Sequence, residues 1–275
     1  MQLFSRRWRC RVGTLQTTNV DVTFKIERHL TGRAGTCELK LFNLSPDHRS
    51  ELHGLPRGTI VQVEAGYADG MSMLFRGDSR RINNRRDGTD WITEATAGEG
   101  EFSIRTARAA RSFAPGTQIG EVVRYLAGAM GLDGTGNIAS ALNGRVLDGL
   151  DAILPEGVVL HGHVAPQLSS LLRSLGLTWS VQGGVLQVIP RGGALGRSAV
   201  LLRAGSGLVD SPERGQHGIV TAKALLIPDL VPGQRVQLES AVISGLYRIE
   251  KVEYSGASQG ADWHAQMDLR ENRAA

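Results

Sequence analysis

Two histidines stand one residue apart in the triplet His161-Gly162-His163, a spacing that could present both imidazoles on one face of a strand. Such a pair binds zinc or a related metal when further ligands lie close by. The sequence offers no evident third ligand, because Cys10 and Cys37 are distant and the other histidines are scattered. We interpret the triplet as a turn before a helix that begins near Ala165, and we expect neither a metal nor a cofactor.

A glycine-containing hexapeptide, Gly-Thr-Gly-Asn-Ile-Ala at 134–139, matches the dinucleotide-binding fingerprint on paper. That fingerprint works only between a strand and the start of a helix. Here a predicted helix precedes it and a polar, glycine-rich stretch over 131–146 surrounds it, so we interpret the match as chance. The sequence also contains no P-loop and no HExxH motif.

Two pairs of carboxylates could serve as the acid and base of a glycosidase that acts on peptidoglycan, namely Glu99 with Glu101 or Asp148 with Asp151. Sequence spacing alone does not place two carboxylates across a sugar, and solvated surface charges are far commoner. We therefore expect no enzymatic activity. A peptidoglycan hydrolase is the alternative.

Eight arginines gather in the stretch 76–111, interleaved with six acidic residues. The excess of two positive charges is small, and so is the net charge of +4 for 275 residues. A nucleic-acid interface needs a larger basic excess and an element that reads the bases, so a nucleic-acid-binding β-barrel module is the less favoured alternative. We expect an arginine-rich hairpin that docks on acidic surfaces of partner proteins. The arginines are Arg76, Arg80, Arg81, Arg85, Arg86, Arg105, Arg108 and Arg111.

The elements that position these residues are predicted to be mainly β. Glycine accounts for 35 of the 275 residues, a share nearly twice the usual ~7 %. This favours tight turns between short strands. In the first segment a short helix begins after Ser45 with Pro46 at its first position, and Gly54 closes it in a left-handed conformation. Period-two alternation predicts strands at 20–26, 37–41, 61–65 and 91–97, and a hairpin over 71–86.

The middle segment changes to a helical period and predicts a compact α+β insert. Thr117 is expected to cap a helix over 119–130, and a second helix follows over 165–175. Two strands then flank Gly183-Gly184, a two-residue hairpin turn. The apolar faces of both helices are expected to cover this hairpin.

Strands return in the third segment, and this segment resembles the first. The run 55–65 parallels 231–240, the triplet 74–76 parallels 246–248, and Asp90-Trp91 parallels Asp262-Trp263. Phe75 precedes Trp91 by 16 residues, as Tyr247 precedes Trp263. Any two antiparallel meanders can share such landmarks, but their equal spacing favours an internal duplication. Strands are predicted at 200–202, 219–226, 234–240, 246–254 and 263–269.

On these residues the sequence resembles the baseplate or tail-tip hub proteins of tailed bacteriophages, a family that includes contractile-phage baseplate hubs and the hub part of type VI secretion spike proteins. The runs 41–45, 58–67 and 74–77 are similar to the first tube-like barrel of these hubs, and the runs 205–209, 225–228 and 245–249 to the second. The middle segment matches their inserted domain only in type. The implied fold has two similar small antiparallel β-barrels, at 1–100 and 193–275, on either side of an α+β domain at 101–192.

The resemblance implies a structural protein that forms a homotrimeric ring. Tail tube or distal tail proteins would lie above the ring, and spike, tip and baseplate proteins below it. Two similar barrels per chain would let three chains adapt a sixfold tube to a threefold tip. Phage DNA would pass through the lumen without specific binding. We expect the contact residues to be Arg80, Arg81, Arg85 and Arg86 of the hairpin, and Glu250, Glu253 and Tyr254 of its counterpart.

The cysteine content and the hydropathy indicate a protein that folds in a reducing cytoplasm. The resemblance implies that this is the cytoplasm of the host bacterium and that the protein then enters the virion tail. Two cysteines are too few for a disulfide scaffold, and Cys37 alternates with Leu39 and Leu41 in a predicted buried strand. The N-terminal residues 1–12 lack a signal-peptide apolar run, and no stretch approaches the ~18 apolar residues of a membrane span. We expect no membrane insertion.

Overall fold

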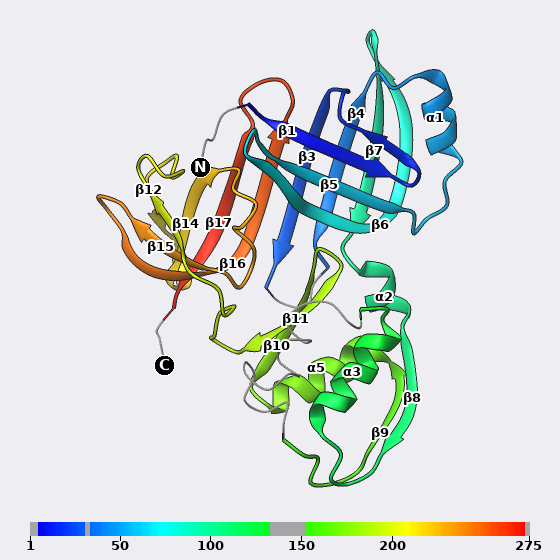
Figure 1. Cartoon of the computed structure of the whole chain (residues 1–275), viewed down its shortest axis with the longest axis vertical. Coiled ribbons are helices and arrows are strands. Elements are labelled where there is room, and N and C mark those ends of the chain that lie inside the picture. The colour runs from blue at the N-terminus through cyan, green and yellow to red at the C-terminus, as the bar shows by residue number, and fades with distance from the viewer. Residues whose placement is uncertain (1–4, 31–33, 133–151, 273–275) are drawn as a thin grey trace.

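The computed structural model describes residues 5–30, 34–132 and 152–272, and it is mainly β. Thirteen strands form one large sheet (Figure 1). In chain order these are β1 (Arg7–Val12), β2 (Leu15–Thr17), β3 (Val22–His29), β4 (Thr36–Phe42), β5 (Ile60–Tyr67), β6 (Gly70–Asp87), β7 (Asp90–Gly98), β12 (Val200–Arg203), β13 (Glu213–Arg214), β14 (Ile219–Leu225), β15 (Arg235–Glu239), β16 (Ser244–Ala257) and β17 (Trp263–Glu271).

The two β segments are joined into this one sheet through β3 and β16. These strands pair antiparallel from Thr23 opposite Ala257 to His29 opposite Lys251. The strand order is β13-β14-β17-β16-β3-β4-β7-β6-β5-β1-β2, with β15 on β16 and β12 on β15. The expected pair of closed barrels is therefore not confirmed. Among the described residues the strand pairings do not close into two separate barrels. Strand β16 belongs to the second β segment and also pairs with β3 of the first.

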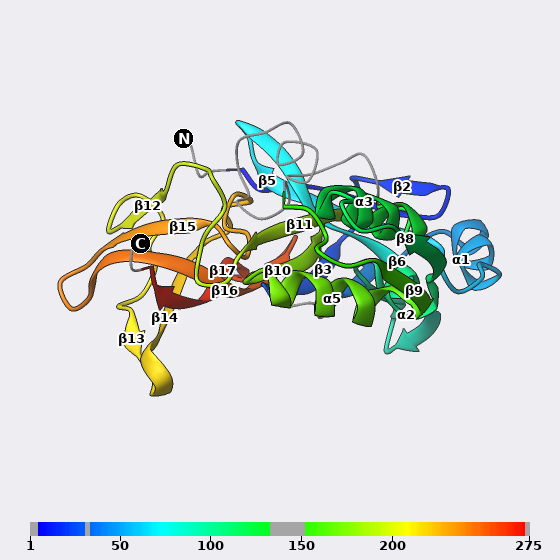
Figure 2. The ribbon, with the colours of Figure 1, turned by 90° about the horizontal axis from the view of Figure 1, so that it is seen from below.

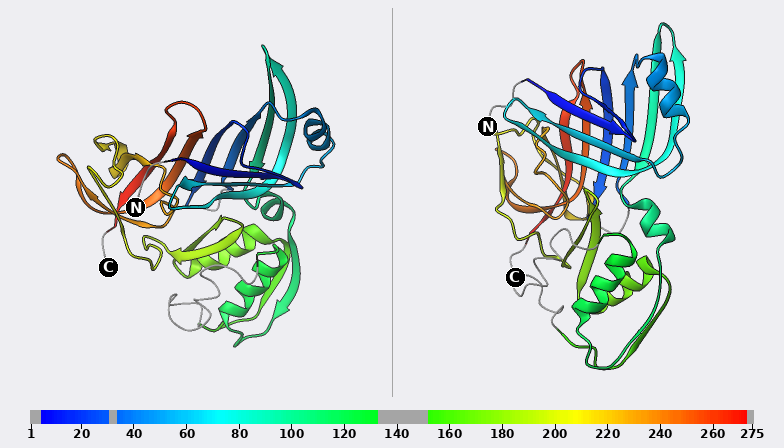
Figure 3. Two further views of the ribbon diagram at one scale, coloured as in Figure 1. Left: turned by 45° about the horizontal axis from the view of Figure 1, so that its top comes forward. Right: turned by 45° about the vertical axis from the view of Figure 1, so that its right-hand side comes forward.

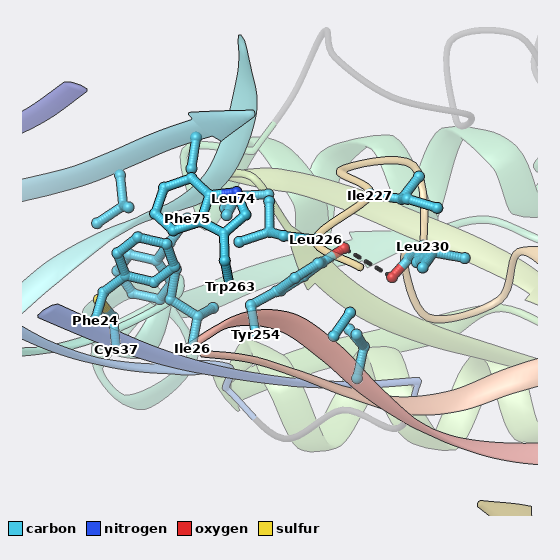
Figure 4. Close-up of a cluster of buried hydrophobic side chains, with 14 of the residues drawn as sticks. Phe24, Ile26, Cys37, Leu74, Phe75, Leu226, Ile227, Leu230, Tyr254 and Trp263 are labelled. Carbon is cyan, nitrogen blue, oxygen red and sulfur yellow. Dashed lines mark hydrogen bonds between the residues drawn. The ribbon is translucent and has the colours of Figure 1, made fainter. Parts of the chain in front are cut away.

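One hydrophobic core lies under both segments (Figure 4). The predicted alternation is confirmed in β3, where Val22, Phe24 and Ile26 are buried and their neighbours are not. Trp263 of β17 packs edge-on against Phe24, with ring centroids 5.7 Å apart. Tyr254 of β16 lies beside them, fully buried. The core therefore holds the first and last segments of the chain together.

The predicted hairpin over 71–86 is wrong, because β6 is a single strand of 18 residues. The start of β6 pairs with β5 and its end pairs with β7. Gly77 in its middle is not a turn residue. A Cβ there would lie 2.4 Å from the carbonyl oxygen of Gly98, so the glycine allows two strands to approach closely.

Helix α1 (Pro46–His53) begins as predicted, since the Ser45 hydroxyl accepts a hydrogen bond from the His48 backbone N–H at 3.3 Å. The expected left-handed closure is wrong. Gly54 has φ −84° and ψ −4°, in the right-handed region, and its N–H donates to the Leu52 carbonyl. The helix packs against β6.

The insert has its own core and lies beside the sheet (Figure 3). The hairpin turn at Gly183-Gly184 is confirmed, with φ values of 65° and 78°. The predicted cap is wrong, because Gln118 precedes α3 and Thr117 instead donates its hydroxyl to the Ala114 carbonyl at 2.7 Å. The elements are α2 (Glu101–Thr106), β8 (Arg108–Phe113), α3 (Ile119–Ala129), β9 (Val158–His163), α5 (Val164–Ser174), β10 (Leu177–Gln182) and β11 (Val185–Pro190), and a short helix η1 (Gln216–Gly218) lies in the last segment.

Candidate assembly interface

A turn that contains a glycine leads into each of two similar three-stranded units. We name them the first repeat unit (β5, β6 and β7) and the second repeat unit (β15, β16 and β17). In the first unit, Gly58 adopts φ 87° and donates its N–H to the Ser79 carbonyl at 2.9 Å. The N–H of Ser79 in turn donates to the carbonyl of Thr59 at 2.8 Å. The turn is thereby tied to the middle of β6.

The second repeat unit has the same arrangement. Gly233 adopts φ 86° and donates to the Ile249 carbonyl at 2.8 Å, and Ile249 returns its N–H to Gln234 at 3.0 Å. Positive φ is costly for any residue with a Cβ, which explains the glycine in both turns. Matching hydrogen bonds support an internal duplication beyond the sequence landmarks.

A β-bulge follows at the same place in each long strand. Arg80 is the extra residue of β6, between the pairs Ser79–Ala97 and Arg81–Thr96. Glu250 is the extra residue of β16, immediately after Ile249. The two predicted contact residues are thus structurally equivalent, with opposite charge. Bulges bend a strand and redirect its side chains, so they set the direction of each hairpin.

The equivalence of the two tryptophans is confirmed, since Trp91 lies opposite Arg86 and Trp263 lies opposite Gly256, the matching positions of the two units. The other landmark pair, Phe75 and Tyr247, is not equivalent, because the two residues differ by two positions along their strands. Tyr247 lies opposite Val236, the place that Gly77 takes in the first unit. The equal sequence spacing therefore does not align the strands β6 and β16 correctly.

The four predicted arginines of the first unit lie along β6 from the bulge to its tip. The Nε–H group of Arg80 donates to the carboxylate of Glu101 in α2. Arg81 and Arg86 are exposed. Arg85 bonds Glu94 at 3.0 Å and Asp87 at 2.7 Å, and these hydrogen bonds, that to Asp87 first, raise the pKa of its guanidinium. Two of the four arginines therefore have carboxylate partners within the chain.

Two predicted residues of the second unit are also part of ion-pair networks. Glu250 accepts from Arg248 at 3.0 Å, and Arg270 lies 3.7 Å away. Glu253 lies 3.0 Å from Lys25 of β3, across the junction of the two segments. These carboxylates help to hold β16 to its neighbours, and such partly exposed pairs are worth roughly 0–1 kcal/mol each.

Tyr254, the remaining predicted contact residue, is placed in the core instead of on a surface. Its hydroxyl donates to the Leu230 carbonyl at 2.8 Å, as Figure 4 shows. Burial raises the pKa of this phenol. Asn84, the equivalent residue of β6, donates its side-chain amide to the Arg49 carbonyl of α1 at 2.9 Å. Each residue thus binds the segment that precedes its repeat unit: Tyr254 binds the loop at Leu230, and Asn84 binds helix α1.

Of the carboxylates considered for a glycosidase, the described pair Glu99 and Glu101 do not face each other across an open cleft. Glu99 is fully buried, 3.3 Å from Arg28, and accepts the backbone N–H of Gly183 in the insert. Burial raises the pKa of Glu99 and the Arg28 charge opposes that rise. Glu101 is the partner of Arg80. Asp148, Asp151 and the glycine-containing hexapeptide 134–139 lie outside the described residues.

The histidine triplet belongs to strand β9, not to a turn, and the side chains of His161 and His163 are both exposed. Within the part of the chain that the structure describes, no group of three or more histidine, cysteine, aspartate or glutamate side chains could hold a metal ion. In the same part of the chain, no helix is long and apolar enough to cross a membrane.

A groove of about 480 Å³ opens beside the first bulge, between β6 and α2. Its lining mixes Arg57, Arg81 and Arg105 with Asp78, and Phe102 of α2 stands 63 % exposed at its side. Burial raises the pKa of the Asp78 carboxyl. A shallow, mixed-charge surface with one exposed aromatic side chain is typical of a protein contact.

The architecture of joined repeat units and an insert recurs in solved structures. A 43 kDa tail protein of prophage MuSo2 from Shewanella oneidensis superposes with a TM-score of 0.70, at 9 % identity, over 98 % of this chain and 97 % of that one. The chain has the fold of a phage tail protein. A tail protein from Neisseria meningitidis gives a TM-score of 0.66 at 11 % identity, over 98 % and 97 % of the two chains.

The same fold also occurs outside phages. A type VI secretion system component from E. coli, itself described as similar to bacteriophage tail proteins, gives a TM-score of 0.60 at 11 % identity, over 95 % of this chain and 76 % of that one. No protein-family profile and no curated protein matches the sequence. The suspected likeness to phage tail and type VI spike components is thus confirmed at the level of the fold.

Sequence reasoning missed the contacts that organise this surface. The pairing of β3 with β16, the Arg28–Glu99 pair and the short strand β13 were not predicted. One signal was available for β13. Its Glu213-Arg214 pair follows Pro212, and charge together with proline is typical of a sheet edge.

Proposed function

We propose that the chain is a structural, non-enzymatic hub protein of a phage-type tail, which forms a homotrimeric ring between a sixfold tail tube and a threefold tip. The observation that carries this proposal is the internal duplication. Both repeat units have the same glycine turn, the same hydrogen bonds to the long strand and the same bulge, at Arg80 and at Glu250.

The duplication supports a role as a symmetry adaptor by simple counting. Each chain carries two similar units in one sheet, with β3 and β4 between them, so three chains carry six. A ring of three chains can thus offer six similar surfaces to the tube and three identical ones to the tip. The fold shared with prophage tail proteins supports a place in the virion tail.

The mixed charge of the β6 surface supports protein partners over DNA as the specific ligand. The exposed arginines at 81 and 86 lie beside carboxylates at 87, 90 and 94, which would repel a phosphate backbone. DNA would cross the lumen of the ring without specific contacts. Tail tube or distal tail proteins would bind one face of the ring, and spike and baseplate proteins the other.

Native mass spectrometry tests the proposal, on the protein alone and co-expressed with the products of neighbouring genes. The expected species is a trimer of about 89 kDa, three times the chain mass of 29.6 kDa. A chain that stays monomeric with every neighbouring product would overturn it. Lysis of purified cell walls by the protein would instead favour the hydrolase alternative.

A further inference from the structure

Among the described residues, the outer half of β6 has an edge without a strand partner at the place where its counterpart in β16 is paired, and α1 packs against β6 through Asn84. Residues 251–257 of β16 pair with β17 on one side and with β3 on the other. The equivalent residues of β6, 81–87, pair with β7 on one side. No strand in the described part of the chain pairs with their other side. An edge of this length would invite pairing with another strand.

The second half of the chain has the complementary feature, an edge strand that lies where β3 lies in the first half. In the first half of the chain, β4 lies beside β3, and in the second half its counterpart β14 lies beside the two-residue strand β13. The registers of these pairs make Glu213 equivalent to Lys25, and Arg214 equivalent to Ile26. Strand β13 thus holds the position of β3, but it ends the sheet. Figure 2 shows β13 extending away from the rest of the chain.

The backbone of β13 is oriented to accept a partner. Gly215 donates its N–H back to Ile219 at 2.8 Å, so the backbone groups of residues 213 and 215 face β14. Those of Arg214 consequently point to the open side, because the groups alternate along a strand. Leu30, an even-numbered residue after β3, likewise donates its N–H to Glu250 of β16 at 2.8 Å.

We propose that β13 of one copy adds antiparallel to the outer half of β6 in a second copy, reproducing between chains the β3–β16 pairing found within the chain. The transferred register places Arg214 opposite Asn84 and Glu213 opposite Arg85. This inference rests on the proposed ring, and it identifies the strands that close it. Each chain offers one edge of each kind, the head-to-tail arrangement that generates rings.

The register places opposite charges next to each other. Glu213 would face Arg85, whose guanidinium also contacts Asp87 and Glu94, in a pair without mutual backbone hydrogen bonds, where side chains lie closest together. The added strand is short at both ends. Pro212 has no N–H to donate, and His217 in η1 has a left-handed φ of 58° that ends the extended conformation. Residues 211–215 are therefore the extent of the added strand. Ser211, Glu213, Arg214 and Gly215 are exposed and free to take this position.

Disulfide trapping in the full-length protein tests the register. The double variant Arg85→Cys/Glu213→Cys places thiols at a close cross-strand position, whereas Arg85→Cys/Arg214→Cys shifts one thiol by a residue and onto the opposite face of the strand. After mild oxidation the first variant should run as covalent dimers and trimers on a non-reducing gel. The shifted variant should run as a monomer.

The outcomes separate this inference from the proposed function. A native trimer in which neither variant cross-links, or both do equally, overturns the strand pairing and leaves the ring intact. Absence of any trimer in the unmodified protein overturns both. A charge exchange provides a second readout. Arg85→Glu and Glu213→Arg should each weaken the trimer, and the double variant Arg85→Glu/Glu213→Arg, which pairs opposite charges again at all joints of the ring, should restore it. Failure of the double variant to restore the trimer contradicts the pairing.

Discussion

The guanidinium of Arg28 on β3 lies 3.3 Å from the carboxylate of Glu99, which directly follows β7, and both side chains are at most 4 % exposed. Glu99 also accepts the backbone N–H of Gly183 from the hairpin of the insert. One buried ion pair therefore links the first β segment to the insert. The second segment joins the same region, because Gln182 donates to the Pro232 carbonyl at 3.1 Å.

Removing one member of this pair should be costly. Glu99→Leu leaves the Arg28 charge buried without a counter-ion, and we expect a loss of about 3–5 kcal/mol in the free energy of unfolding. The double variant Arg28→Met/Glu99→Leu removes both charges and should lose less than either single variant. Urea titrations of the four proteins in the cycle measure this difference. Purely additive losses would contradict a coupled pair.

The two equivalent tryptophans should differ in their contribution to stability. Trp263 is buried between Trp8 and Phe24, and Trp263→Ala should cost about 3–5 kcal/mol. Trp91 is 36 % exposed, with the Arg49 guanidinium 4.4 Å from its ring centroid. Trp91→Ala should cost about 0.5–1 kcal/mol. Equal losses in thermal or urea unfolding would show that the positions do not differ in burial.

Neither native thiol should react in the folded protein. Burial, together with the Glu64 charge, raises the pKa of Cys10 to about 12, and burial likewise raises the pKa of Cys37. Since the thiolate is the reactive species, a thiol-reactive dye at pH 8 should label neither cysteine until denaturant is added. The Arg85→Cys variant provides the control, with one accessible thiol. Labelling of the native wild-type chain would contradict this burial.

His264 should make the folded protein less stable in mild acid. Burial, and next the Lys223 charge, lower its pKa below the ordinary 6.5. The unfolded chain then binds a proton at a pH where the folded chain resists it, so stability falls as the pH drops through 6.5 towards the lowered value. Above both values the group has no effect. His264→Gln should flatten the stability profile in this window, and an unchanged slope would contradict the effect.

Charge reversal on the exposed side of the β6 hairpin should weaken assembly without unfolding the chain. Arg81→Glu/Arg86→Glu changes two exposed side chains, so the melting temperature should stay within a few degrees. The population of the proposed trimer in native mass spectrometry should fall. Arg108→Glu/Arg173→Glu, on exposed positions of the insert, is the matched control. Equal effects of both variants would indicate a general response to charge.

Local periodicity predicted many of the strands because one face of each lies on a core. In β3 the alternation of Val22, Phe24 and Ile26 identifies the strand and its buried face. In β6 the polar run after the bulge lacks this alternation, and the strand was mistaken for a hairpin. Turn chemistry also predicted the hairpin at Gly183-Gly184, where two positive φ values are required.

Pairings between distant strands could not be read in the same way. Ile26 pairs with Tyr254, 228 positions later in the sequence, and nothing local to either strand specifies the other. A shift of one residue exchanges the two faces of a strand, so the sequence did not show that Tyr254, predicted to be a contact residue, is part of the core. The arginines of β6 were easier to place, because consecutive exposed charges exclude a core position.

The β3–β16 pairing also has a consequence for biosynthesis. Ribosomes add roughly 5–20 residues per second, so β3 emerges about 10–50 s before its partner strand exists. During that interval the insert, with its local contacts, can fold, while the edge of β3 stays uncovered. Completion of the sheet therefore waits until β16 has been synthesised, and any nascent chain that stalls or is truncated before β16 exposes a hydrophobic strand to aggregation and to cellular chaperones.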